Sequence, residues 1–217
     1  KYCYALSSIK IPGSVTSIGD DVFYRCYELS NIDISEGLTS IGNGMFSGCS
    51  SLSSIEIPSS VTSIGNDAFF CCTSLGSINI PNSVTSIGDR SFGNCSSLAS
   101  IEIPNSVTSL GENAFYYCSK LSSVRIPSIT YVGETPFSYC NVTEYYIDDI
   151  GWWMNNGINV NNNNNARPFE KCLDIYLNDV LLTEIVAPEN ATRISDSAFR
   201  NCKSLVSIVI PENVTRS

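Results

Sequence analysis

Apolar residues return along the chain every 23 residues, each time in the same order of hydrophobic and polar positions. In the clearest copy, Leu52, Ile55 and Ile57 have the spacing of a short strand with both isoleucines on one face. Ser54 and Glu56 then point to the opposite face. The leading leucine recurs at positions 6, 29, 75, 98 and 121. This period predicts a solenoid, because one repeat can bury its apolar side chains only against its neighbours.

The rest of each repeat predicts three more short segments. Pro58 ends the strand, because proline has no N–H to give to a ladder. Residues 61–64 are mostly β-branched and predict a second extended segment. Gly65 is expected to turn the chain with a positive φ, and residues 66–69 to form one capped helical turn, 3₁₀ or α. Together these segments predict a right-handed, β-rich coil with a parallel sheet on one face.

The shared form of the repeat, L-x-x-I-x-I-P-x-x-V-T-x-I-G-x-x-A-F-x-x-C, resembles the BspA-like leucine-rich repeats over residues 3–140 and 182–215. The resemblance implies a curved leucine-rich-repeat solenoid, with the parallel β-sheet on its concave face and short 3₁₀ or helical turns elsewhere. It also implies the setting of that family. Its members are secreted or surface-attached proteins of oral and gut bacteria and of some parasitic protists, and they often act in adhesion to host proteins or other cells.

The regularity breaks in the second half of the chain. Cys140 follows Cys118 by 22 residues instead of 23, and residues 148–172 insert into the pattern. Residues 174–182 predict a β-hairpin that turns at an Asn-Asp pair, because both residue types tolerate the left-handed conformation of such turns. The carboxylates of Asp148 and Asp149 leave calcium binding at the start of the insertion as an open alternative, although no D-x-D-x-D-G spacing supports it.

Interruptions of this kind also occur in BspA-like arrays, so one domain is expected over residues 1–217. Regular repeats cover 3–140, an irregular repeat with the insertion and the hairpin covers 142–181, and regular repeats resume over 182–217, truncated at the end. The chain starts and stops inside the pattern and has no initiator Met, so we expect a processed or excised piece of a longer protein.

The composition argues against several functional classes. The net charge of −9 argues against nucleic acid, because phosphate binding requires clustered Lys and Arg. The sequence has no His, the commonest general base and metal ligand, and no nucleophile motif, phosphate-binding glycine loop or metal-ligand spacing. We therefore expect no enzyme activity, no cofactor and no bound metal. No apolar run approaches the roughly 20 residues that span a bilayer, so no membrane insertion by this segment is expected.

Nine of the ten cysteines stand at one position of the repeat. Disulfide frameworks and zinc sites use irregular or C-x-x-C spacings, so this column is interpreted as small apolar groups that fill the coil beside Phe69 and its equivalents. Disulfides between neighbouring turns are the competing interpretation, since a spacing of about 5 Å fits disulfide geometry. Only Cys71 stands outside the column. We expect its thiol to face outward and, with no His to activate it, to be inert.

Binding residues are sought among positions that vary between repeats, because the constant positions build the coil. The position between the two strand isoleucines varies most, and it points outward on the concave face. The partner-binding candidates at this position are Lys10, Asp33, Glu56, Asn79, Glu102, Arg125 and Tyr146. A nearly constant row of serines lies beside them. The two rows predict a mixed-charge groove floored by hydroxyl groups.

An aromatic contact patch is the second candidate site. It consists of Tyr116, Tyr117, Tyr139, Trp152 and Trp153. Exposed aromatic residues are typical anchors of protein interfaces. Alternatively, the two tryptophans cover the broken end of the strand stack.

The residues and the resemblance together lead us to expect a non-catalytic binding or adhesion module of a secreted or cell-surface protein. It would present its concave face to a protein or glycan of a host or neighbouring cell. The alternative is a structural stalk or spacer of a larger surface protein, with no specific ligand.

Overall fold

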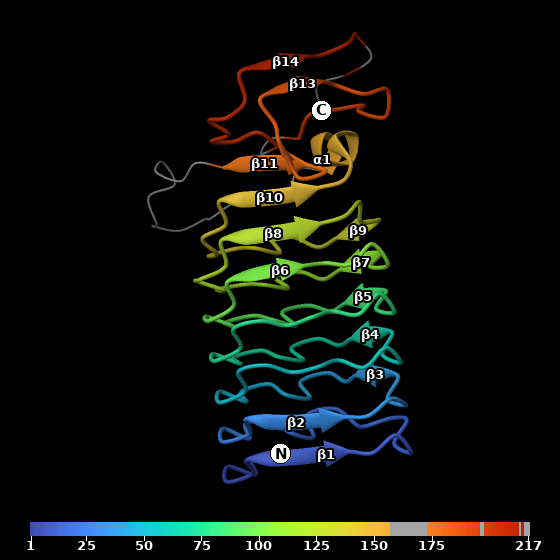
Figure 1. Ribbon diagram of the computed structural model, residues 1–217, viewed down its shortest axis with the longest axis vertical. Coiled ribbons are helices and arrows are strands. Elements are labelled where there is room, and N and C mark those ends of the chain that lie inside the picture. The colour runs from blue at the N-terminus through green and yellow to red at the C-terminus, as the bar shows by residue number, and fades with distance from the viewer. Residues whose placement is uncertain (157–172, 196–197, 213, 215–217) are drawn as a thin grey trace.

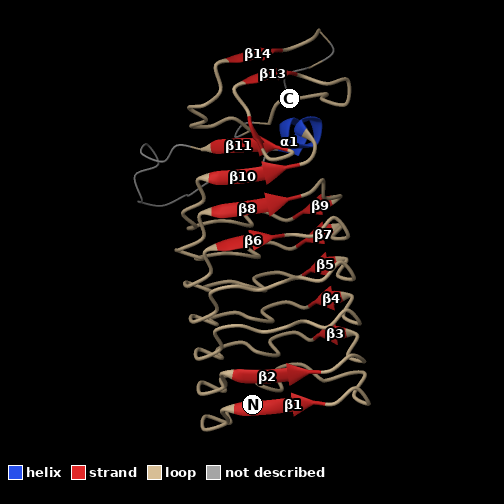
Figure 2. Ribbon diagram, viewed as in Figure 1, coloured by secondary structure: helices blue, strands red, loops and turns tan. Residues whose placement is uncertain are grey.

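The computed structural model describes residues 1–156, 173–195, 198–212 and 214, and it stacks the repeats as turns of a β-solenoid (Figure 1). The turns follow one another in chain order along the long axis. Most of each turn is loop, with short strands on two of its sides (Figure 2). The predicted solenoid with parallel sheets is therefore confirmed.

The first side of the coil carries the strands that begin the repeats. They are β1 (Ser8–Ile11), β2 (Asn31–Ile34), β6 (Ser100–Glu102), β8 (Ser123–Ile126), β10 (Glu144–Ile147), β11 (Asp174–Leu177) and β12 (Val180–Leu181). β1 pairs with β2, and β6, β8, β10 and β11 pair in parallel in that order. Between these two groups, Glu56 and Asn79 form an isolated parallel bridge. We call this side the first sheet.

The second side carries the β-branched segments, as predicted. Its strands are β3 (Ser40–Ile41), β4 (Ser63–Ile64), β5 (Ser86–Ile87), β7 (Ser109–Leu110) and β9 (Tyr131–Val132), all parallel. Threonines flank these strands and tie the turns together. Thr62 Oγ1 donates to the Thr39 carbonyl at 3.2 Å, and Thr85 Oγ1 donates to the Thr62 carbonyl at 3.2 Å. The threonine hydroxyl groups at this position therefore bond each turn to the preceding one.

The third side of each turn is not helical, so the expectation of a 3₁₀ or helical turn at residues 66–69 is wrong. Asp67 has a φ of 52° and Cys71 a φ of 61°, both in the left-handed region. A right-handed helical turn needs negative φ throughout. The segment forms tight turns instead, in which the Phe70 N–H donates to the Asp67 carbonyl at 3.0 Å.

The left-handed residues align backbone groups for bonding between turns. The N–H groups of Asp67, Phe69 and Cys71 donate to the carbonyls of residues 89, 91 and 93 in the next turn, at 2.8, 2.7 and 2.8 Å. The same pattern runs from Tyr2, which donates to the Tyr24 carbonyl, up to residues 117 and 138. Each of these bonds has its donor on the earlier turn and its acceptor on the later one. The third side is therefore a continuous hydrogen-bonded face without strands.

From Gly65 to Gly133 the recurring glycine is required by space, which corrects the expectation of a positive φ at Gly65. The glycines with positive φ in the described chain are Gly37, Gly44 and Gly48, which stand elsewhere in the repeat. A Cβ at Gly65 would lie 2.8 Å from the Asn43 amide nitrogen and 2.9 Å from the Gly42 carbonyl carbon. Such a distance is too short for a side chain, so the glycine lets consecutive turns approach each other.

The interior of the coil is a set of stacked columns. The central one is a phenylalanine column whose neighbouring ring centroids lie 5.1 to 5.5 Å apart, with planes within 19° of each other. Its members are Phe23, Phe46, Phe69, Phe92, Phe115 and Phe137. Leu52 and Cys72 are also fully buried beside it. The predicted inward positions are thus confirmed.

The irregular repeat contains a helix and the predicted hairpin. The helix α1 (Ile150–Asn156) begins after Asp149, whose Oδ1 accepts hydrogen bonds from the N–H groups of Gly151 at 2.7 Å and Trp152 at 3.1 Å. The hairpin of β11 and β12 is confirmed, with φ of 49° at Asn178 and 67° at Asp179. Two further parallel strands follow, β13 (Glu184–Val186) and β14 (Ser207–Val209).

Candidate functional site

The strand register places the partner-binding candidates in one row on the outer face of the first sheet. Lys10 lies opposite Asp33, and Arg125 lies between Glu102 and Tyr146. The Glu56–Asn79 bridge supplies the members in between. We call these seven residues the variable row: Lys10, Asp33, Glu56, Asn79, Glu102, Arg125 and Tyr146. The first five are exposed, and the last two are half-buried.

Contacts along the variable row differ between its two ends. Lys10 Nζ lies 2.6 Å from Asp33 Oδ2, with both side chains largely exposed, so the pair adds little stability. Arg125 pairs with Asp179 of the hairpin turn, and its guanidinium also lies 4.9 Å from the centre of the Tyr146 ring. Arg125 therefore fastens the hairpin to the regular repeats.

Tyr176 extends the variable row, and the sequence interpretation missed it. Its ring stacks on Tyr146 with centroids 4.6 Å apart and planes at 11°. Desolvation and the Glu144 carboxylate raise the pKa of Tyr146, whose hydroxyl donates to Glu144 Oε2 at 3.3 Å. The sequence feature that indicates this placement is the position of Tyr176 between Ile175 and Leu177, which repeats the alternation of the earlier strands.

The row becomes aliphatic beyond the tyrosine pair. Leu181 lies opposite Tyr176 in the hairpin, and Val186 lies opposite Val209 in the last strand pair. Val186 is 73% exposed and Val209 is 58% exposed. The outer face of the first sheet and of the β13–β14 pair that follows it thus runs from charged through aromatic to aliphatic side chains.

A groove opens in the middle of the variable row. It encloses about 670 Å³, and it is lined by residues of two consecutive turns together with Arg125. Its polar lining consists of Asn79, Asn82, Glu102, Asn105, Ser106 and Arg125. At this groove the mixed-charge surface expected from the sequence is concave on the scale of a small ligand.

The aromatic contact patch is only partly assembled. Tyr117 stacks on Tyr139 with centroids 4.7 Å apart, and Tyr116 meets both rings edge-on. Trp153 does not belong to this patch, because it is 2% exposed and its Nε1 donates to the Ala198 carbonyl at 2.6 Å. Trp152 is half-buried, and its Nε1 donates to the Ile129 carbonyl at 2.9 Å. The tryptophans therefore tie α1 to residues 129 and 198.

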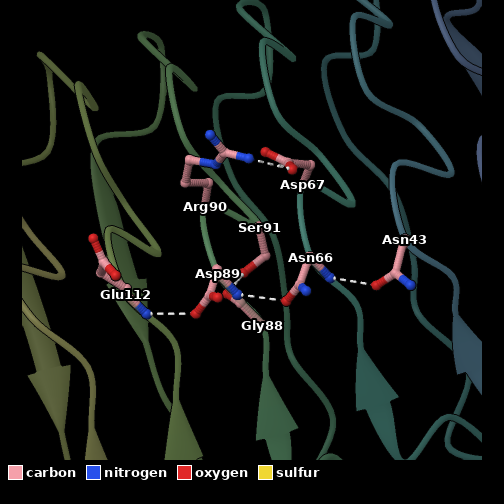
Figure 3. A network of polar contacts seen from close by, with 8 residues as sticks. All are labelled: Asn43, Asn66, Asp67, Gly88, Asp89, Arg90, Ser91 and Glu112. Atoms are coloured by element: carbon pink, nitrogen blue, oxygen red, sulfur yellow. Dashed lines mark hydrogen bonds and ion pairs between the residues drawn. The ribbon is translucent and has the colours of Figure 1, made fainter.

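A polar ladder occupies the third side but is part of the scaffold (Figure 3). The side-chain oxygen of Asn43 accepts the N–H of Asn66 at 2.8 Å, Asn66 in turn accepts that of Asp89, and Asp89 that of Glu112. Arg90 pairs with the Asp67 carboxylate at 2.9 Å beside this ladder. Asn43, Asn66 and Asp89 each bond the neighbouring turn in this way, so the ladder helps to hold consecutive turns together.

From Cys26 to Cys140 the cysteine column is buried, and its thiols act as hydrogen-bond donors. The Sγ atoms of Cys49 and Cys72 donate to the carbonyls of Phe23 and Phe46 in the preceding turn, each at 3.2 Å. Burial raises the pKa of Cys49 to about 12 and that of Cys72 well above its ordinary value. The nine cysteines in the described part of the chain are free thiols, and Cys172 lies outside that part. The competing interpretation of disulfides between turns is therefore wrong for the described cysteines.

The burial of the cysteines predicts the order in which their thiols react. In the native protein at neutral pH, N-ethylmaleimide should modify the exposed Cys3 readily and the half-buried Cys71 and Cys202 more slowly. Cys49 and Cys72 should react only after denaturation, because a protonated, buried thiol is neither nucleophilic nor accessible. Peptide mass spectrometry after timed labelling measures this order. Native labelling of Cys72 as fast as that of Cys3 would contradict it.

No group of three or more His, Cys, Asp or Glu residues that could hold a metal ion occurs in the described ranges. Asp149 was one of the two carboxylates considered for calcium binding. It caps α1, and its Oδ2 also accepts a hydrogen bond from Asn190 Nδ2 at 3.0 Å. Within the same ranges, no helix has the length and apolar character needed to cross a bilayer.

Comparisons with known proteins agree with this architecture. A family model described as a BspA type leucine rich repeat region matches six copies, over residues 1–121, 39–152 and 173–217. A leucine-rich repeat protein of T. pallidum is 30% identical with a TM-score of 0.60, over 64% of this chain and 68% of that one. No curated protein sequence matches the chain.

Two longer structures show how much of a related protein the chain represents. A leucine-rich repeat protein from Bacteroides ovatus is 26% identical with a TM-score of 0.71, over 97% of this chain and 56% of that one. One from Eubacterium ventriosum shares the fold at 23% identity and a TM-score of 0.58, over 97% of this chain and 57% of that one. The chain thus spans little more than half the length of both proteins.

Proposed function

Because this chain belongs to the BspA-type leucine-rich repeat family, we propose that it is a non-catalytic binding module of a secreted or surface-exposed protein. Its variable row engages a protein or glycan of a host or neighbouring cell. Proteins of this family are commonly surface proteins, and an extended repeat face is their natural contact area.

The observation that carries this proposal is the contrast between the variable row and the rest of the turn. Asn66 and Asp89 are bonded to the next turn, Thr62 to the previous one, and Phe69 and Cys72 are buried. On the outer face of the first sheet, side chains of every chemical class follow one another instead. A uniform spacer has no need for that variety, whereas a surface that recognises one partner does.

A charge exchange within the row tests the proposal. Lys10→Glu combined with Glu56→Arg reverses two exposed charges, keeps the net charge and leaves the central groove intact. Saturable attachment to immobilised matrix proteins or to intact cells should weaken at least about tenfold, which is about 1.4 kcal/mol. Surface plasmon resonance and cell-binding titrations measure the change.

The matched control is Glu28→Arg combined with Lys120→Glu. These residues occupy the same position of two other repeats, are exposed, and lie off the variable row. The control should attach like the wild type, and both variants should unfold at the wild-type temperature. Equal attachment of both variants, or no saturable attachment of the wild type to any surface, would refute the proposal and favour a spacer.

A further inference from the structure

We propose that the groove in the middle of the variable row binds a neutral saccharide about as large as a disaccharide. The groove is defined by Asn79, Asn82, Glu102, Asn105, Ser106 and Arg125. This inference rests on the proposed function, because it names the ligand class of one part of the binding face.

The groove has the size and position of a small-molecule site. Its volume of about 670 Å³ falls within the range of roughly 300 to 1,000 Å³ that is usual for such sites. Asn82 and Asn105 stand at the same position of two consecutive turns, one residue after Pro81 and Pro104. The two turns therefore place equivalent amide groups at the groove.

The groove coincides with an interruption of the first sheet. Asn79 bridges to Glu56 on one side, and β6 pairs with β8 on the other. Between Asn79 and Glu102, which are both in the described part of the chain, no strand pairing is assigned. The groove therefore lies where the strands of two consecutive turns are not paired.

The lining has the chemistry that sugar hydroxyl groups require. Each amide of Asn79, Asn82 and Asn105 offers a carbonyl acceptor and an NH₂ donor, and a hydroxyl group is itself both donor and acceptor. The Glu102 carboxylate adds two acceptor oxygens, which bind hydroxyl donors more strongly than neutral oxygens do. Isoleucine and proline residues of both turns complete the lining and offer an apolar surface to the C–H face of a sugar ring.

The charges disfavour ionic ligands. Arg125 is paired with Asp179 and lies over the Tyr146 ring, so a carboxylate already offsets its positive charge, and Glu102 repels an anion. A cation would meet a single carboxylate beside a guanidinium group. A peptide is also disfavoured, because the aliphatic side chains that would anchor it, such as Val186 and Val209, lie at the far end of the row.

The experiment uses the full chain and a panel of neutral disaccharides: maltose, lactose, cellobiose and N,N′-diacetylchitobiose. Saturation-transfer NMR should detect at least one of them, and calorimetric titration should then give a saturable isotherm. Asn82→Ala combined with Asn105→Ala should weaken that binding at least about tenfold. Both side chains are exposed, so the fold should tolerate the change.

Asn31→Ala is the matched control, because it removes an exposed amide from the same sheet, in β2 and outside the groove. It should bind the saccharide like the wild type. No signal with any of the four disaccharides, or equal binding by the Asn82/Asn105 variant, would overturn the inference. A signal confined to sialylated or sulfated saccharides would overturn it as well.

The two proposals fail separately. If the Lys10/Glu56 variant loses attachment while no disaccharide binds, the binding face stands and the saccharide site does not. If a disaccharide binds and the Asn82/Asn105 variant loses it, the saccharide site stands whether or not the Lys10/Glu56 variant changes attachment.

Discussion

Replacing Phe69 by alanine is expected to lower the free energy of unfolding by about 3 to 5 kcal/mol. The Phe69 ring is fully buried and stacks on Phe46 at 5.5 Å and on Phe92 at 5.2 Å. Its removal leaves a cavity that adjacent turns cannot close, because backbone bonds on the second and third sides fix their separation. The loss should appear in urea denaturation followed by far-ultraviolet circular dichroism.

Phe23→Ala is the internal comparison for this prediction. The Phe23 ring is 8% exposed and has one stacking neighbour in the column, at 5.5 Å. Its removal should cost clearly less than the removal of Phe69, and the unfolding should start at the N-terminal turns. Equal losses for the two variants would show that the columns do not act as nearest-neighbour stacks.

Gly111→Ala should destabilise the protein by about 3 kcal/mol or more, beyond the cost of ordinary overpacking. A Cβ at this position would come closer than 3.0 Å to the Asp89 amide nitrogen and to the Gly88 carbonyl carbon. These are backbone atoms, so relief requires that two turns move apart. Such a movement would break the hydrogen bond from the Gly111 N–H to the Ile87 carbonyl, which is 2.8 Å long. Thermal unfolding of the purified variant measures the loss.

Gly19→Ala tests the physical reason for that loss. Gly19 occupies the same position of the repeat near the N-terminal end of the stack, and an added Cβ there would meet nothing within 4 Å. We expect no loss, or a gain of about 0.4 to 1 kcal/mol through the smaller entropy of the unfolded chain. A large loss at Gly19 would mean that conformation, and not the approach of turns, selects glycine in this column.

The repeat spacing was sufficient to predict the architecture. Leucine and isoleucine spacing gave the first sheet, β-branched residues gave the second, and Asn178-Asp179 gave the hairpin turn. Each of these predictions rests on a local preference of the residue types involved. The inward columns of phenylalanine and cysteine followed from their fixed place in the repeat.

The conformation of the third side could not be predicted from the local preferences of its residue types. Tyr117 has a φ of 60° and Arg90 a φ of 49°, although neither residue type favours the left-handed region. The Tyr117 N–H reaches the Ser138 carbonyl at 2.9 Å, so hydrogen bonds between turns stabilise this conformation. The expectation of a positive φ at the recurring glycine was wrong because a sequence shows that glycine recurs at a position but not whether conformation or lack of space requires it.

The candidate site was predicted in part. The alternation around the strand isoleucines placed the variable row, because the pleat of a strand fixes which side chains point outward. Tyr176 was missed because the hairpin was interpreted as an interruption and was not aligned with the repeats. The groove between Asn79 and Glu102 lies where no strand pairing is assigned. The residue types on either side of it do not indicate this interruption of the sheet. The burial of Trp153 depends on Ala198, a contact 45 residues away in sequence.

The uniform direction of the backbone–backbone bonds on the third side has a consequence for how such molecules change length. Each turn there accepts these hydrogen bonds from the preceding turn and donates the same set to the following one. An in-frame duplication or loss of one whole repeat therefore creates junctions that are chemically identical to the old ones. The turn that ends at Cys140 is one residue shorter and still fits. Selection can thus lengthen or shorten the binding surface in whole repeats, while every remaining contact in the scaffold is kept.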